Sequence, residues 1–473
     1  MLSFYHYYPS TLQMLRTQVS LLRRAGPGVS VLRRLASASP CAWPRSCDVL
    51  VVGGGAVGSS SAYHLKQRAG RDLSVVVLEQ DPTYERASTV LSLSNIRQQF
   101  SVAENTLLSM YGVTFLRRAS ELLAVEGQDP PDVSFFPRGY LFVATPEGLH
   151  QMEENYKQQT SLGAEVAWLW PEQLRQWYPW LTFGENIAAG VVGTNNEGWF
   201  DPWSLLLGMR RKAESLGAVY LPAKLTGLEY QQESNEGHRA TTDGDQTTTT
   251  PTRSLTTAQM RLRNGEEREI SFSKLVVAAG AWSGEVGRLA GLGTGEGILA
   301  SPIPVEPRKR FVYTAHAPEG PWEGCPVYND YTGMYFRPDS SNPQHFFCAR
   351  SPLEEEEPDA SDLSVDHSFF DTHIWPLMVE RCPAFGNLKV KSSWAGYYDY
   401  NTLDQNLILG FHPVYTNMCI ATGLSGHGIQ QSPAVGRAVM ECVVDGRSHS
   451  INLDRFGFGR ILTRQPLKEK MVM

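Results

Sequence analysis

The most constraining feature of the chain is Asp48–Gln67, which reads DVLVVGGGAVGSSSAYHLKQ. An apolar run leads into a cluster of glycines, and a helix-like pattern follows it. Strand, glycine turn and helix form the context that a dinucleotide fingerprint requires. The first glycine makes the turn, the second lets a pyrophosphate approach the backbone, and the third lets helix and strand pack closely. The sequence therefore predicts a dinucleotide site at Gly53, Gly55, Ala56, Val57 and Gly58.

A second apolar run supports this interpretation over a chance match of glycines. Leu73–Leu78 is followed directly by Glu79, 21 positions after Gly58. A carboxylate at this place binds the ribose hydroxyls and disfavours a 2′-phosphate, which argues against NADP. FAD and NAD both remain open at this point.

The first 47 residues differ in composition from the rest. They contain six arginines and no acidic residue, since the first acid is Asp48. An Arg-rich, Ser-rich, acid-free segment is typical of a mitochondrial transit peptide, with a disordered basic tail as the alternative. Arg23, Arg24 and the Gly26–Gly28 stretch interrupt any apolar core of a secretory signal. We expect residues 1–47 to be a transit peptide and linker, and the protein to reside in the mitochondrial matrix.

Charge and cysteine content exclude several classes of function. The formal net charge is −7, which makes the chain a poor candidate for binding nucleic acid. The seven cysteines form no CxxC pair, so we expect reduced thiols and no metal site. The sequence contains no run of 18 apolar residues, so it predicts no membrane span.

Two later segments also look like parts of a nucleotide-binding domain. Lys274–Ser283, KLVVAAGAWS, suits a buried parallel strand that ends beside a cofactor, with an ordinary buried strand as the alternative. Ile420–Arg437, IATGLSGHGIQQSPAVGR, predicts a strand, a glycine turn and a helix. The start of that helix can stabilise negative charge, such as that of a reduced flavin. An NAD dehydrogenase would not explain this C-terminal turn.

Together the three segments resemble the D-amino-acid-oxidase-like family of FAD oxidoreductases, over roughly residues 48–460. This family includes sarcosine oxidase, glycine oxidase and dimethylglycine dehydrogenase. The stretches 196–203, 304–310 and 394–406 are similar to a mitochondrial member implicated in assembly of respiratory complex I. The resemblance implies an α/β fold: a Rossmann-like FAD-binding domain built from discontinuous segments, plus a substrate domain with an antiparallel sheet.

The implied domain limits follow from where the motifs lie. The FAD-binding domain would comprise 48–130, 190–295 and 392–465, and the substrate or cap domain 131–189 and 296–391, with a tail at 466–473. Residues 231–259 contain almost no large apolar side chain, so we expect a flexible insertion there.

The resemblance also implies site residues. Arg97 falls where the family has an arginine beside the flavin or the substrate carboxylate, with a surface arginine as the alternative. His427 could relay a proton or stabilise its turn, and Tyr397, Tyr398 and Tyr400 could form an amine-binding cage or simply pack. The implied catalytic residues are Arg97, Tyr397 and His427. The implied FAD contacts beyond the N-terminal turn are Glu79, Gln80, Ser88, Thr89, Ala279, Gly280, Gly426, His427, Gly428, Ile429 and Gln430.

Departures from the family pattern bear on how FAD is held. Tyr397 stands where sarcosine-oxidase-like members have a flavin-linking cysteine, and Ser88–Leu91 contains no linking histidine. We therefore expect non-covalent FAD. Gln430 replaces a lysine that often follows the glycine turn, so a charge beside the flavin is lost. Ser94 and Asn95 stand where glycine is common.

The resulting expectation is a mitochondrial FAD-dependent oxidoreductase that oxidises a small amine or amino acid and is required for complex I assembly. Its partners would be that substrate and complex I subunits or assembly intermediates, with peripheral association at the inner membrane. The alternative is an assembly chaperone that retains FAD for stability without turnover.

Overall fold

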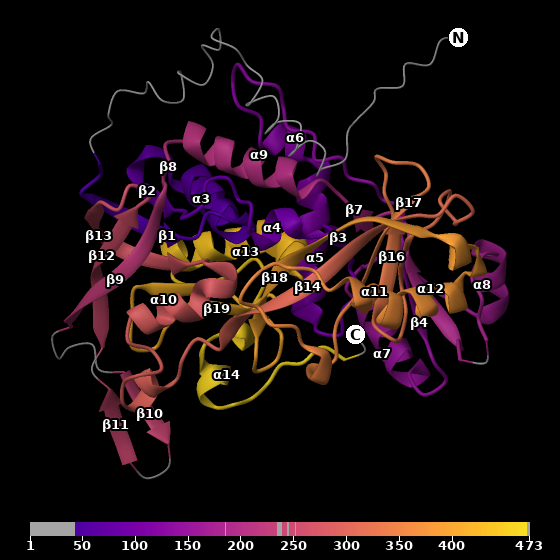
Figure 1. The fold of residues 1–473 in the computed structure, drawn as a ribbon. Helices are drawn as coiled ribbons and strands as arrows, with labels where there is room; N and C mark the ends of the chain where they lie inside the picture. Colours follow the sequence, from indigo (N-terminus) through magenta and orange to yellow (C-terminus); the bar gives the residue numbers. More distant parts are fainter. Residues whose placement is uncertain (1–42, 185, 234–238, 244–245, 251, 471–473) are drawn as a thin grey trace, which may run out of the picture.

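The computed structural model describes residues 43–184, 186–233, 239–243, 246–250 and 252–470, and two large sheets organise them (Figure 1). The first sheet has eight strands in the order β19-β20-β13-β1-β2-β8, and β12 pairs with both β13 and β9. Their bounds are Ser46–Val52 (β1), Val75–Leu78 (β2), Val219–Leu221 (β8), Ala223–Gln232 (β9), Arg253–Leu262 (β12), Glu267–Val277 (β13), Ile408–Phe411 (β19) and Met418–Thr422 (β20).

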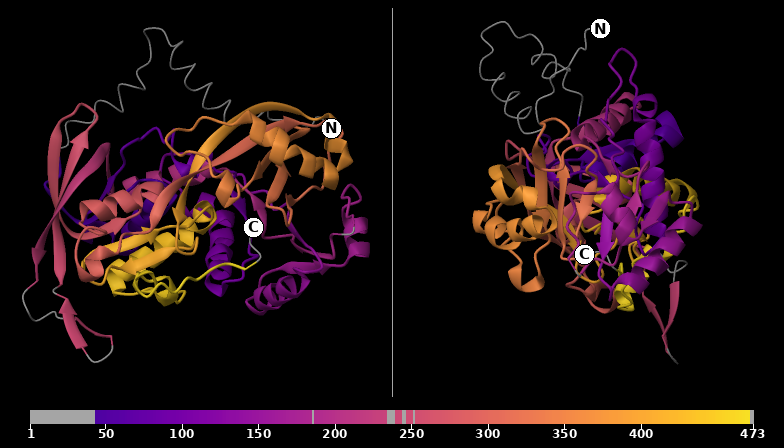
Figure 2. Two further views of the ribbon diagram at one scale, coloured as in Figure 1. Left: turned by 60° about the horizontal axis from the view of Figure 1, so that its bottom comes forward. Right: turned by 90° about the vertical axis from the view of Figure 1, so that its right-hand side faces the viewer.

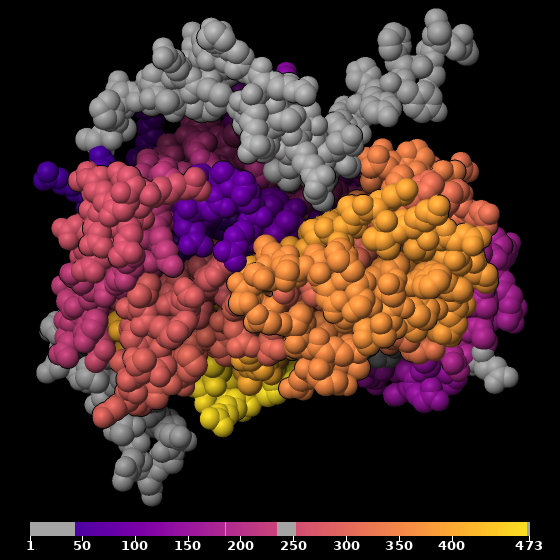
Figure 3. Space-filling view, in the orientation of Figure 1, coloured from indigo at the N-terminus to yellow at the C-terminus, as the bar shows by residue number. Residues whose placement is uncertain are grey.

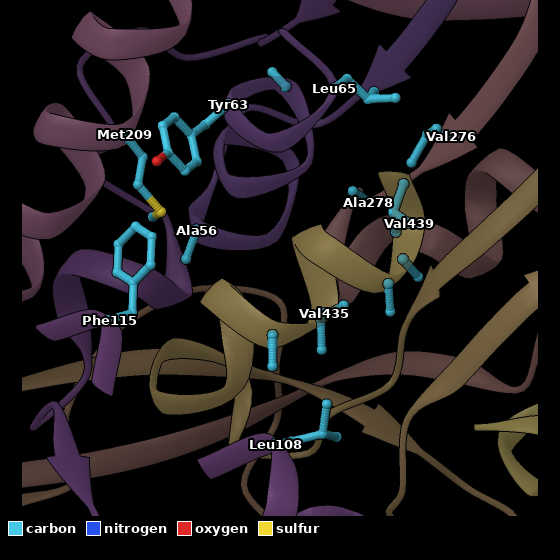
Figure 4. Close-up of a cluster of buried hydrophobic side chains, with 14 of the residues drawn as sticks. Ala56, Tyr63, Leu65, Leu108, Phe115, Met209, Val276, Ala278, Val435 and Val439 are labelled. Atoms are coloured by element: carbon cyan, nitrogen blue, oxygen red, sulfur yellow. The ribbon is translucent and has the colours of Figure 1, made fainter. Parts of the chain in front are cut away.

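The centre of this sheet is parallel and buried on both faces. β1 pairs in parallel with β2 and β13, and β13 pairs in parallel with β20. Such strands read as continuous apolar runs because helices cover them. On one face the core includes residues of α3 (Ala56–Ala69), α5 (Ala103–Arg117), α9 (Pro202–Ser215) and α13 (Gly428–Asp445), and on the other face it includes residues of α10 (Ser283–Leu289). Figure 4 shows side chains from the first four of these helices and from β13 meeting in one core, among them Tyr63, Leu108, Met209, Val276 and Val439.

The second sheet forms the substrate domain. Its order is β18-β14-β17-β16-β15-β4-β6-β5, and all of its pairs are antiparallel except β15 with β4. The bounds are Tyr140–Ala144 (β4), Val166–Leu169 (β5), Ala189–Gly193 (β6), Val305–His316 (β14), Val327–Asn329 (β15), Met334–Pro338 (β16), His345–Arg350 (β17) and Lys389–Asn401 (β18). Its helices are α7 (Leu149–Ser161), α8 (Pro171–Trp177), α11 (His367–His373) and α12 (Trp375–Arg381).

Short elements complete the described chain. They are α4 (Ser88–Leu91), β3 (Asn95–Ile96), α6 (Ala119–Leu122), β7 (Gly198–Trp199), β10 (Arg239–Asp243), β11 (Gln246–Thr250), α10 (Ser283–Leu289) and α14 (Gly459–Leu462). β3 pairs with β7, and β10 with β11, each as a separate two-stranded sheet.

The predicted fold class is confirmed: a parallel α/β domain carries a second domain with a largely antiparallel sheet. In the space-filling view, early and late segments share one face of the molecule (Figure 3). Two predicted domain limits need correction. β6 and β18 lie in the substrate-domain sheet, whereas the sequence assigned 190–295 and 392–465 to the FAD-binding domain. Apolar strands do not reveal from sequence alone which sheet they join.

The predicted insertion at 231–259 lies partly outside the described residues, and its described bounds are narrower than predicted. Gln231 and Gln232 end β9, residues 253–259 belong to β12, and the described part between them forms the β10–β11 hairpin, which projects from the body of the molecule (Figure 2). β9 pairs with β12 and β10 pairs with β11, so the described part of this polar segment is in strands although it has few large apolar side chains.

The described residues add three findings. None of their helices is both long and apolar enough to cross a bilayer. No group of three or more His, Cys, Asp or Glu side chains among them could hold a metal ion. The six cysteines that the structure describes are free and buried. The predicted transit peptide falls almost entirely on residues 1–42, outside the described part of the chain.

Candidate active site

A cavity of about 1560 Å³ lies where the carboxyl ends of β1, β2, β13 and β20 face the substrate domain. Ligands of open α/β sheets bind at these strand ends. Apart from Gly58, every residue that the sequence predicted for cofactor or substrate lines this cavity. Segments more than 300 residues apart, such as the turn after β1 and the start of α13, therefore contribute to one site.

The glycines of the first turn differ in what a side chain would meet. Gly53 has φ +100°, and a Cβ there would lie 2.3 Å from the Ala278 carbonyl oxygen. A Cβ on Gly58 would lie 1.8 Å from the Gly53 carbonyl oxygen, so Gly58 is needed for helix–strand packing. A Cβ on Gly55 would meet only Thr89 Oγ1, at 3.4 Å, and Gly55 lines the cavity. At Gly55, therefore, a ligand in the cavity can approach the backbone closely.

The N-terminus of α3 leaves backbone donors for a ligand. The Ala56 amide donates to Thr89 Oγ1 at 3.1 Å. The amides of Gly55 and Val57, which also line the cavity, have no acceptor within the described residues. Free amides at a helix start bind phosphate well, because the helix dipole adds to the hydrogen bonds. These residues therefore fit a pyrophosphate.

Glu79 lies at the end of β2 on the same cavity wall. Its carboxylate accepts from the Gly54 amide at 2.9 Å and the Asp81 amide at 2.7 Å. Burial raises the pKa of Glu79 above its ordinary value, although these two hydrogen bonds oppose the shift. The carboxylate is thereby fixed at the strand end, where a ribose could donate to its remaining lone pairs.

Further predicted contacts follow β2 and β13. Ser88 and Thr89 begin the short helix α4. Ala279 and Gly280 follow β13, with Gly280 at φ +54°, and the Gly280 carbonyl accepts from Thr422 Oγ1 at 3.2 Å. Gln80 lines the cavity beside Glu79.

The turn before α13 is held by a buried carboxylate. Asp399, on β18, accepts from the amides of Gly423, Leu424 and Ser425 at 2.9–3.1 Å. Burial raises the pKa of Asp399 to about 6, against the effect of these hydrogen bonds. Because β18 belongs to the substrate domain, this residue ties that domain to the turn that starts α13. Asp399 lies in the stretch 394–406 that carries the resemblance, but it was not predicted as a site residue.

The first turn of α13 again offers free donors. Gly428, Ile429 and Gln430 line the cavity, and none of their amides has an acceptor in the part of the chain that the structure describes. Gly426 has φ +102°, and a Cβ there would lie 2.6 Å from the Tyr398 ring. A group that gains negative charge would be stabilised at this helix start.

Arg97 is buried, so the surface alternative is wrong: its exposure is 4%. Its guanidinium donates to the Gln99 carbonyl and, at 3.2 Å, to His427 Nε2, and it lies 4.2 Å from the Phe100 ring centroid. Arginine has no acceptor, so His427 Nε2 must accept and be unprotonated. Arg97 forms no ion pair within the described residues.

His427 is poorly suited to act as a base near neutral pH. Burial, with a smaller contribution from the charge of Arg97, lowers its pKa to about 3. An efficient general base has a pKa near the working pH. Of the two roles considered for His427, proton relay is therefore disfavoured. The side chain of His427 does not stabilise its own turn either, because it accepts a hydrogen bond from Arg97.

The three tyrosines of β18 lie on different faces of the strand. Successive side chains of a strand point to opposite faces. Tyr397 contacts Trp282 and accepts from Arg86 at 3.2 Å, whereas Tyr398 and Tyr400 lie beside Arg310 on the other face. All three tyrosines nevertheless line the same cavity, so the amine cage stays a prediction.

A buried glutamate near Arg97 was also missed. Glu197 accepts from the Gln98 amide at 2.6 Å and from Gln99 Nε2 at 2.7 Å. Burial raises the pKa of Glu197 to about 7, although its hydrogen bonds and the nearby charge of Arg97 lower it. Its only signal in the sequence was its place in the stretch 196–203, which carries part of the resemblance. It shapes the segment that follows Arg97.

The substrate domain closes the cavity with polar and aromatic side chains. They were not predicted as site residues, because a strand pattern does not show which side chains face a cavity. They are Tyr140, Asn329, Tyr335 and Arg310. Arg310 is neutralised by a two-pronged ion pair with Glu357, at 2.8 and 2.9 Å.

Comparison with known proteins agrees with this geometry. The model of the family described as FAD dependent oxidoreductase matches residues 48–442. FAD-dependent oxidoreductase domain-containing protein 1 of Xenopus laevis is 47% identical over 438 residues, covering 91% of this chain and 85% of that protein. The bovine (Bos taurus) protein of the same name is 44% identical over 435 residues, covering 91% and 88%.

The fold is shared with a solved amino-acid dehydrogenase. L-proline dehydrogenase from P. horikoshii superposes with a TM-score of 0.72 at 24% identity, covering 90% of this chain and 100% of that one. The family match spans both sheets, and the free amides of α3 and α13 fit a flavin dinucleotide. The chain therefore belongs to the FAD-dependent oxidoreductase family, and its cofactor is FAD.

Proposed function

We propose that this protein is a mitochondrial flavoenzyme that oxidises a C–N bond of a small amino acid or N-substituted amino acid. The observation that carries the proposal is Arg97: a buried guanidinium that lines the cavity and has no ion pair among the described residues. An unpaired buried charge is costly unless a ligand completes it. A carboxylate is the ligand that a planar guanidinium matches best.

Each part of the site has a task in this proposal. FAD, when bound, supplies the acceptor for a hydride. The free amides of α3 hold its pyrophosphate, and those of α13 stabilise the charge that reduction creates. Neutral His427 accepts from Arg97 and fixes the direction of the guanidinium. Tyr140 and Tyr335 close the opposite wall and limit access of water.

Arg97→Met tests the role of Arg97 with the substrates as internal controls. Loss of a hydrogen bond to a charged group costs about 1.5–3 kcal/mol, so kcat/KM for carboxylate-bearing substrates should fall roughly 10- to 100-fold. Oxidation of the matching amines that lack the carboxylate should change little. Anaerobic bleaching of the flavin by a panel of such pairs gives the measurement. Equal losses for both members of each pair would remove Arg97 as the carboxylate partner.

Non-covalent attachment of FAD is part of the proposal. Within the described residues, no cysteine lines the cavity, and its histidine, His427, is engaged by Arg97. Acid precipitation should therefore release the flavin into the supernatant. Yellow colour retained in the pellet would mean a covalent link.

A role in assembly of respiratory complex I is a second candidate, supported by the resemblance and by the arginine-rich N-terminus. A binding role is favoured by Trp170 and Trp177 at α8, which are 51% and 48% exposed. Exposed tryptophans are common in protein interfaces. Arg97→Met distinguishes the candidates in cells that lack the protein: rescue of complex I by this variant would mean that assembly does not need turnover. Matrix residence, with peripheral contact to the inner membrane, is part of the same proposal.

A further inference from the structure

The chain after α14 forms a strap, residues 465–470, that lies against the FAD-binding domain. The Leu467 amide donates to Asp404 at 2.9 Å, and the Leu467 carbonyl accepts from Asn406 at 2.5 Å. The Lys470 amide donates to Ser101 Oγ at 2.7 Å. The backbone on either side of Lys468 is thus fixed by hydrogen bonds.

Glu469 anchors the strap at the start of α5. Its carboxylate accepts from the Ser101 amide at 2.6 Å, the Val102 amide at 3.1 Å and Asn105 Nδ2 at 2.6 Å. α5 has no side-chain cap of its own. A carboxylate at this place satisfies free amides and interacts well with the helix dipole.

The same network reaches the start of α13. Asn105 donates to Asn406 at 2.7 Å and accepts from Gln431 at 3.3 Å. Gln431 lies in the first turn of α13, next to the free amides described above. The strap is therefore connected through Asn105 to the first turn of α13.

The strap places the side chain of Lys468 at the cavity. This side chain is exposed, and it forms no hydrogen bond or ion pair among the described residues. Most other cations of the cavity are engaged. Arg97 donates to His427, Arg263 pairs with Asp81, and Arg310 pairs with Glu357.

We infer that Lys468 provides a positive charge to the pyrimidine edge of bound FAD and so raises the reduction potential of the flavin. Reduction adds negative charge at N1 and the C2 oxygen, so a nearby ammonium stabilises the reduced form more than the oxidised form. The inference rests on FAD binding in the proposed orientation, but it does not require amine turnover.

The test compares holoenzyme variants that differ in one charge. Lys468→Gln removes it, Lys468→Arg keeps it, and Lys470→Gln removes an exposed lysine from the same strap as a matched control. Two properties are measured: the flavin midpoint potential and the affinity for sulfite. Sulfite adds to flavin N5 through its sulfur lone pair, and the resulting adduct carries negative charge at the pyrimidine edge.

Lys468→Gln should weaken sulfite binding about tenfold. It should also lower the two-electron midpoint potential by about 30 mV, which corresponds to a tenfold change in the equilibrium constant for reduction. Lys468→Arg and Lys470→Gln should match the unaltered protein. If Lys468→Gln behaves like Lys470→Gln in both measurements, the inference is overturned.

Failure of the proposed function would look different. A negative amine screen leaves the potential and the sulfite affinity measurable, whereas absence of flavin from the purified and FAD-supplemented protein would contradict the family assignment itself. If Lys468→Gln folds but loses FAD, the role of Lys468 is in binding and the inference about potential is wrong.

Discussion

Single buried side chains determine where the flavin end of the site lies. Asp399 is the clearest case, because one carboxylate accepts from three successive amides of the turn before α13. Removing a buried acceptor leaves those amides unsatisfied, and hydrogen bonds to a charged group are worth about 1.5–3 kcal/mol. A residue of the substrate domain thus controls a turn of the other domain.

We expect Asp399→Ala to fold but to bind FAD at least about tenfold more weakly, since the free amides of α13 lose their fixed direction. FAD titration of the apoprotein by flavin fluorescence quenching measures this. Asp359→Ala, which removes an exposed carboxylate bonded to Ser361, is the control. Unchanged FAD affinity in Asp399→Ala would mean that the turn is held by its own backbone.

At the scale of the element, glycines decide whether β1, α3 and β13 can meet. Two glycines of one motif have different roles: Gly58 lets α3 pack closely against the turn after β1, and Gly55 lets a ligand approach the backbone. Gly58→Ala should destabilise the protein by more than about 4 kcal/mol, because its Cβ would overlap backbone that cannot move. Gly55→Ala should keep the unfolding midpoint and lose FAD affinity.

Thermal unfolding of the apoprotein, followed by FAD titration, distinguishes the two variants. Gly386→Ala is the control, because a Cβ there meets nothing within 4 Å. If Gly55→Ala were as unstable as Gly58→Ala, access to ligand would not be the reason for Gly55.

Local motifs were predictable because their physical cause is local. The turn after β1, Glu79 at the end of β2, and the turn before α13 each combine a strand end, glycine and a helix start within a few residues. Asp399, Glu197 and Lys468 were not predictable in this way. Each acts on a segment distant in the sequence, and a lone charged residue looks the same whether it is buried or solvated.

For the whole molecule, the two domains are interleaved rather than consecutive. β6 and β18 belong to the substrate-domain sheet, and after each of them the chain returns to the FAD-binding domain, at α9 and at β19. Arg337 of β16 donates to the Leu93 carbonyl and to Asn95, both at 2.9 Å, just before Arg97. Sequence periodicity describes one element at a time, so it could not show which sheet these strands enter.

The β10–β11 hairpin is the exception to this interleaving. It pairs with no other strand among the described residues, and no described residue between 239 and 250 lines the cavity. At its base the Glu233 amide donates to the Thr252 carbonyl at 3.1 Å, and Gln232 lies opposite Arg253 in the β9–β12 pair. The two long strands therefore already meet beneath the hairpin.

Replacing residues 234–251 with Asn-Gly should join β9 and β12 directly, because this dipeptide favours a two-residue hairpin turn. FAD uptake should be unchanged, and the free energy of unfolding should stay within about 0.5 kcal/mol, as for surface changes. Urea unfolding and the flavin absorbance of the purified protein provide the measurement. A shortened protein that loses FAD or stability would show that the segment supports the fold. If it folds, binds FAD and oxidises substrate but no longer supports complex I, the hairpin is a contact for assembly partners and is separate from the flavin site.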